Sequence, residues 1–116
     1  MDYSSAYRVA QDIRDSEEYK TYHGMKESVM GDETTAALIR EYRKLQMTLQ
    51  IAAASGHTPD TEDVQRFSGI STLLFSKKEV SDFLLAEMRL QQAMADIFKI
   101  VTEAAGLDIT VPGLEG

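Results

Sequence analysis

Apolar residues recur alternately four and three positions apart along residues 77–105, within the longest stretch of the chain that lacks proline and glycine. Side chains with this spacing form a narrow stripe along one face of an α-helix, which predicts a helix packed lengthwise against another helix. The same spacing occurs in residues 38–52. No segment shows the sustained alternation of apolar and polar residues that is typical of a half-buried strand. The sequence therefore predicts an all-α fold.

Helix-starting and helix-ending residues divide this chain of 116 residues into segments. They comprise two pairs with capping-box spacing, two helix-ending glycines and one proline suited to a first helical position: Asp15 with Glu18, Ser76 with Glu79, Gly31, Gly56 and Thr58-Pro59. We predict five helices at about 4–14, 16–30, 33–55, 59–75 and 77–105. They form a single helical domain over residues 1–105, followed by a loose C-terminal tail over 106–116.

The third and fifth predicted helices are long for a chain of this size. A helix of roughly 28 residues extends about 42 Å, whereas a compact chain of ~100 residues has a radius of gyration of about 13 Å. The prediction is therefore an elongated antiparallel bundle of about five helices that dimerises through the heptad-like seams of its two long helices. The predicted interface residues are Leu38, Tyr42, Leu45, Leu49, Phe83, Glu87, Leu90, Met94 and Ile97.

Glu87 is the one charged residue within these seams. A bare carboxylate in an apolar seam carries a large desolvation penalty. One interpretation is a pair with a cation of the third helix, or a seam position near solvent. The other is a specificity device that fixes helix register or the choice of partner.

Charge is unevenly distributed along the chain, which has a net charge of −7. Residues 34–58 hold one acid and three bases, Arg40, Arg43 and Lys44. These bases form either a solvated helix face or a candidate docking patch for an acidic partner or RNA. The overall acidity disfavours direct binding of nucleic acid.

Few residues could carry catalysis. The chain has no cysteine, which excludes thiolate metal sites and cysteine nucleophiles. His23 and His57 lack the partners of a known metal motif, and no phosphate-binding or nucleophile motif occurs. We therefore predict a protein that is not an enzyme and has no cofactor. Without a visible signal peptide or a membrane-spanning apolar run, we expect it to be cytoplasmic.

Three segments resemble motifs of one family. Residues 13–20 (IRDSEEYK) are similar to the I-x-x-S-E-E-Y opening of the YlbF/YmcA/YheA family of small helical bacterial proteins. Residues 41–50 (EYRKLQMTLQ) resemble its E-F-x-K-L-Q-x-x-L-Q helix, and residues 83–90 (FLLAEMRL) its Y-L-x-A-E-x-x-L segment. Together the three segments lie in the family's order at matching spacing, and the resemblance covers about residues 6–104.

The resemblance implies an adapter that acts by protein–protein interaction. Characterised relatives regulate competence, sporulation and biofilm formation, and they form a complex that associates with ribonuclease Y and affects mRNA processing. Some carry cysteines that bind iron–sulfur clusters, which this chain lacks. The implied partners are further copies of the chain, family paralogues and ribonuclease Y. The alternatives are a YheA-like homo-oligomer of undefined activity and a direct nucleic-acid-binding regulator.

Overall fold

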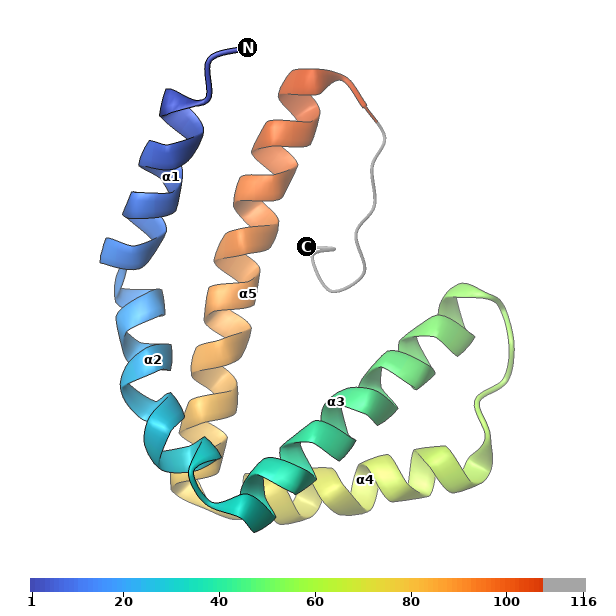
Figure 1. Ribbon diagram of the computed structural model, residues 1–116. Coiled ribbons are helices and arrows are strands. Elements are labelled where there is room, and N and C mark those ends of the chain that lie inside the picture. Colours follow the sequence, from blue (N-terminus) through green and yellow to red (C-terminus); the bar gives the residue numbers. More distant parts are fainter. Residues whose placement is uncertain (108–116) are drawn as a thin grey trace. The chain divides into compact units, whose positions relative to one another are not determined.

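The computed structural model describes residues 1–107, which form five α-helices and no strand (Figure 1). The helices are α1 (Ser4–Asp15), α2 (Glu17–Met30), α3 (Glu33–Ala54), α4 (Thr61–Phe75) and α5 (Lys78–Ala105). The predicted all-α class, the five helices and the greater length of α3 and α5 are confirmed. Most of the tail predicted over residues 106–116 lies outside the described residues.

At the two junctions where capping boxes are predicted, the side chains make other hydrogen bonds. Ser16 precedes α2, and its Oγ accepts a hydrogen bond of 3.2 Å from the backbone N–H of Tyr19. Asp15 instead accepts a hydrogen bond from the Gln11 amide one turn earlier. At residues 76–79 no capping box forms, because Ser76 donates its hydroxyl hydrogen to the Leu73 carbonyl at 2.7 Å.

The start of α4 also differs from the prediction. Asp60 is the N-cap, and its carboxylate accepts a hydrogen bond of 3.0 Å from the backbone N–H of Glu62. Pro59 therefore precedes the helix instead of opening it. A charged acceptor next to the free amides of the first turn is a strong cap, because it also interacts favourably with the helix dipole.

The chain divides into two compact units, of which the first comprises residues 1–25 together with 83–116. In its described part, α1 and α2 lie beside α5 (Figure 1). Phe83 is fully buried, and its ring stacks on Tyr22 with centroids 5.2 Å apart. Leu84, Ala86 and Ala95 of α5 are also buried, whereas α1 contributes no buried residue.

The second unit, residues 26–82, contains the hairpin of α3 and α4. Ile39 and Leu74 are fully buried in it, and Tyr42 of α3 stacks on Phe67 of α4 with centroids 5.0 Å apart. Gly56 follows α3 with a φ of +73°, a left-handed conformation that glycine adopts without strain. Its predicted role as the residue that ends this helix is confirmed.

Within the second unit, one polar contact joins α2 to α5 and another lies at the start of α3. Ser28 of α2 donates a hydrogen bond of 2.6 Å to Glu79 in the first turn of α5. Asp32 accepts one of 2.6 Å from the hydroxyl of Thr35, which is buried. Glu79 therefore joins two helices, and this contact replaces the capping role that its spacing from Ser76 predicted.

Candidate protein-interaction surfaces

The predicted seam of α3 packs against α4. Leu45 is buried, Leu38, Tyr42 and Leu49 are half-buried, and the ring of Tyr42 also meets Phe75 edge-on at 6.2 Å. This row thus has a partner inside its own hairpin. Its role as an interface between copies stays a prediction.

The predicted seam of α5 has two kinds of environment. Phe83 is enclosed by its own unit, as described above, and Glu87 is half-buried with an interaction partner within the chain. Leu90, Met94 and Ile97 are half-buried and line a depression between α5 and α1. The seam therefore contributes to the core at one end and to an open surface at the other.

We call this depression the α1–α5 groove. Its volume is about 300 Å³, and Val9 and Ile13 of α1 complete its apolar lining. Asp12 and Glu18 also line it, and both are exposed. Tyr7 of α1 and Val101 of α5 are exposed as well. An apolar depression with charged residues at its margin is typical of a site that another molecule covers.

A second row on α3 lies on the opposite side of the helix from the row that packs against α4. Met47 follows Leu45 by two residues, which turns its side chain by about 200° around the helix. Met47 is 44% exposed and Ile51 57% exposed. We call the residues spaced four, three and four apart on this side the outer row of α3: Arg40, Lys44, Met47 and Ile51.

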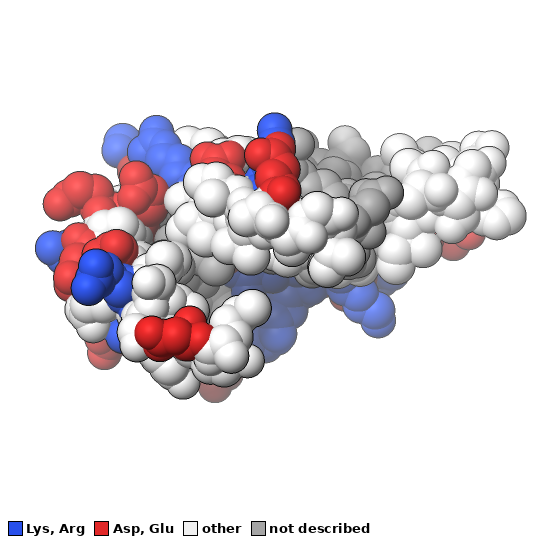
Figure 2. Space-filling view, turned by 90° about the horizontal axis from the view of Figure 1, so that it is seen from above, with Lys and Arg blue, Asp and Glu red and all other residues white. Residues whose placement is uncertain are grey.

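The structure places the three bases of the predicted patch in two different environments. Arg40 and Lys44 are exposed, whereas Arg43 is half-buried and has an interaction partner within the chain. Sequence reasoning missed Met47 and Ile51 as surface residues, although their spacing from Lys44 repeats the pattern of the seam. Beyond Lys44 the hairpin carries no charged residue before Asp60, and Figure 2 shows this end of the hairpin as largely uncharged surface.

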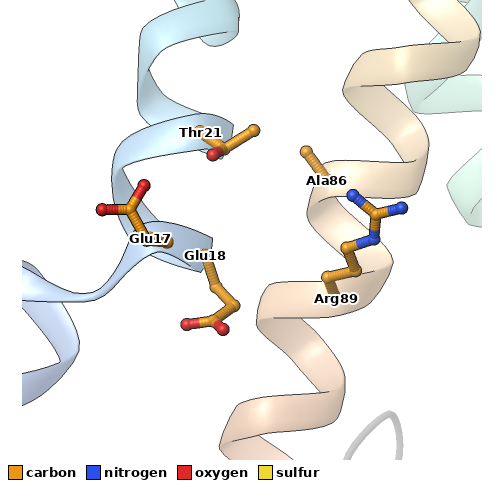
Figure 3. Close-up of a pocket in the computed structure, with 5 residues that line it drawn as sticks. All are labelled: Glu17, Glu18, Thr21, Ala86 and Arg89. Atoms are coloured by element: carbon orange, nitrogen blue, oxygen red, sulfur yellow. The ribbon is translucent and has the colours of Figure 1, made fainter.

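A smaller pocket of about 160 Å³ lies between α2 and α5. Glu17, Glu18 and Thr21 contribute from α2, and Ala86 and Arg89 from α5. In Figure 3, Thr21 and Ala86 face each other across the gap, and the carboxylate of Glu18 extends toward α5. Glu18 thus borders both this pocket and the α1–α5 groove.

The histidines lack the surroundings of a metal centre. His23 lies beside two aromatic rings, with centroids 4.1 Å from Tyr19 and 5.0 Å from Tyr22. His57 is exposed after α3. Within residues 1–107, no group of three or more His, Asp or Glu side chains is arranged to hold a metal ion.

The hydropathy of the helices bears on whether one of them could span a membrane. None of the helices in the described part of the chain combines the length and the apolar character needed to cross a membrane.

Comparison with known proteins gives consistent matches over nearly the whole chain. The family model described as control of competence regulator ComK, YlbF/YmcA, matches residues 3–105. A UPF0342 protein of Symbiobacterium thermophilum is 28% identical over 107 residues, which cover 92% of this chain and 96% of the relative. A UPF0342 protein of Halothermothrix orenii is 29% identical over 108 residues, which cover 93% and 92% of the two chains.

A solved structure shares the fold. A protein of unknown function (DUF964) from Bacillus stearothermophilus matches with a TM-score of 0.69, covering 90% of this chain and 91% of its own. The two sequences are 18% identical, so this match concerns the fold alone.

Proposed function

The chain belongs to the YlbF/YmcA family, whose model is described as control of competence regulator ComK, and from this premise we propose that it is a non-enzymatic regulatory adapter. It acts in the cytoplasm through protein–protein contacts. The predicted resemblance to this family is confirmed by the match over residues 3–105. Like the factors it resembles, the adapter associates with ribonuclease Y and affects mRNA processing, and through it competence, sporulation and biofilm formation.

The observation that carries this proposal is the exposure of apolar side chains on two separate surfaces. Met47 and Ile51 are exposed on α3, and the α1–α5 groove is lined by apolar residues. Large apolar areas rimmed by polar residues mark interaction sites in soluble proteins. The family's description as a regulator of competence agrees with an activity exerted through partners.

Affinity purification followed by mass spectrometry tests the adapter function. The tagged full-length protein replaces the native copy in its own host, and an unrelated tagged helical protein serves as the control. We expect ribonuclease Y and family paralogues to be enriched with this chain alone. Recovery of only the chain itself would contradict the adapter function.

Transcript mapping provides an independent readout of the same function. A strain without this protein is expected to accumulate the uncleaved transcripts that also accumulate when ribonuclease Y is depleted, and the wild-type chain restores cleavage. Cleavage sites that are unchanged in the deletion strain would contradict a role in mRNA processing.

Direct binding of RNA is the second candidate, and Arg40 and Lys44 are the exposed bases that favour it. Contacts of this kind weaken steeply as salt rises, because binding releases counterions from the phosphates. If the chain were an RNA-binding regulator, Arg40→Glu/Lys44→Glu would abolish retention of RNA on filters while Lys99→Glu would not. For the wild-type chain, we expect that filters retain no RNA through salt-sensitive contacts when the assay is run at roughly physiological ionic strength.

A further inference from the structure

We propose that the outer row of α3 in one copy of the chain lies in the α1–α5 groove of a second copy. The outer row of the second copy lies in the groove of the first in the same way. This inference rests on the proposed adapter function and names a second copy of the chain as one partner. It adds which surfaces meet and which charges select them.

The groove is apolar along its floor, with Asp12 of α1 and Glu18 of α2 at its margin. Helices α1 and α5 run in opposite directions (Figure 1), so by chain order Val9 and Ile97 lie toward one end of the groove and Glu18 and Leu90 toward the other. A matching helix would therefore place an apolar side chain beside Val9 and a cation beside Glu18.

The outer row of α3 has this composition. Arg40 and Lys44 come first along the helix, and Met47 and Ile51 follow. With Arg40 beside Glu18 and Ile51 beside Val9, the cations lie toward the Glu18 end of the groove, and Met47 and Ile51 lie toward the Val9 end. The row then runs antiparallel to α1. The reverse orientation would place Arg40 beside Val9 and the apolar side chain of Ile51 beside the carboxylate of Glu18.

The shape of the outer row also suits the groove. The row's spacing of four, three and four residues keeps its side chains on one stripe, the form that fits between two helices.

A second copy is the occupant that the charges favour. The chain carries nineteen acids and twelve bases, and residues 34–58 alone hold three of the bases against one acid. Row and groove are therefore complementary surfaces of the same molecule. Because every copy carries both, two copies related by a two-fold axis make the contact twice. Reciprocity doubles the buried area toward the 1,200–2,000 Å² or so of a stable interface.

A charge exchange between two variants tests this pairing. The row variant carries Arg40→Glu/Lys44→Glu, and the groove variant carries Asp12→Lys/Glu18→Lys. Both change exposed residues. Each variant alone places like charges at both contacts of its own dimer. In an equimolar mixture both contacts become favourable, because the acidic row meets the basic groove and the native row meets the native groove.

Sedimentation equilibrium of the purified full-length proteins measures the outcome. We expect a wild-type dimer, dimerisation weakened at least ~100-fold in each variant alone, and a heterodimer in the mixture. A chain carrying all four substitutions is expected to dimerise with itself again. Lys99→Glu is the control for a general charge effect and keeps the wild-type dimer. Far-ultraviolet circular dichroism verifies that each variant is folded.

Two results would overturn the proposal. One is a wild-type chain that stays monomeric. The other is a mixture of the two variants that stays monomeric or shows no more heterodimer than either variant shows homodimer. Either result leaves the adapter function standing if ribonuclease Y is still recovered from the host. Conversely, a confirmed dimer that recovers no partner would refute the adapter function alone.

Discussion

Tyr22 of α2 and Phe83 of α5 stack with their ring centroids 5.2 Å apart and their planes inclined by 20°. Phe83 is fully buried, and Tyr22 also meets His23 edge-on at 5.0 Å. The pair joins helices from distant parts of the sequence within one compact unit. The stack therefore identifies the part of the α5 seam that belongs to the core of that unit.

Truncation of this core residue is expected to be strongly destabilising. Phe83→Ala removes a fully buried ring and leaves a cavity, so we expect the free energy of unfolding to fall by about 3–5 kcal/mol. Leu85→Ala is the control, because Leu85 lies on the same helix and is 42% exposed; its cost should stay below about 1.5 kcal/mol. Urea denaturation followed by circular dichroism measures both. Equal losses would show that Phe83 is not a core residue.

The aromatic contact inside the hairpin is expected to couple α3 to α4. Tyr42 and Phe67 stack at 5.0 Å with their planes inclined by 16°. A double-mutant cycle with Tyr42→Leu and Phe67→Leu should give a coupling energy of about 0.5–1.5 kcal/mol, because each leucine keeps apolar volume but loses the ring contact. Additive effects of the two substitutions would indicate that the rings do not interact in solution.

The sequence predicted the helices well but chose some caps wrongly, for a physical reason. At each junction several oxygens compete for the same free amides. Asp15 and Ser16 are adjacent, and Thr58 and Asp60 lie two residues apart. A spacing rule cannot rank candidates that lie so close together. In the structure Ser16 and Asp60 make the bonds. Hydrogen-bond geometry decides between such neighbours, and one-dimensional spacing does not contain it.

The candidate surfaces were harder to predict than the helices. Helix α3 carries two rows with the same alternating spacing, one through Leu45 and one through Met47. The spacing alone does not state which row α4 covers. The tertiary fold decides, since Tyr42 meets Phe67 and Phe75 of α4 and thereby leaves the opposite row exposed. Arg40 and Lys44 of the predicted basic patch are exposed on this opposite row together with Met47 and Ile51, and the role of the patch in docking stays a prediction.

Acid is expected to weaken the first turn of α3. The hydroxyl of Thr35 donates to Asp32 and holds the pKa of that carboxyl below its ordinary value of 3.8. A carboxyl group whose pKa is lower in the folded state than in the unfolded state stabilises the folded protein above pH 3.8. This stabilisation is lost as the pH falls through the lowered pKa. Thr35→Val removes the main donor, so the Asp32 pKa should rise toward 3.8.

Carbon-13 shifts of the side-chain carboxyls measure this titration directly. Asp2, whose pKa is lowered by hydrogen bonds from Ser4, serves as the internal control and should not change in the Thr35→Val variant. An Asp32 midpoint that is the same with and without the Thr35 hydroxyl would contradict the assignment.

Two glycines are expected to respond to the same substitution with opposite signs. An added Cβ meets no atom within 4 Å at either position, so steric contacts do not distinguish Gly24 from Gly56. Gly24 lies inside α2, where alanine favours the helix by about 0.5–1 kcal/mol. Gly56 has a φ of +73°, where an alanine side chain costs about 1–2 kcal/mol. Thermal unfolding should therefore shift upward for Gly24→Ala and downward for Gly56→Ala. A downward shift for both would mean that the central part of α2 is not helical in solution.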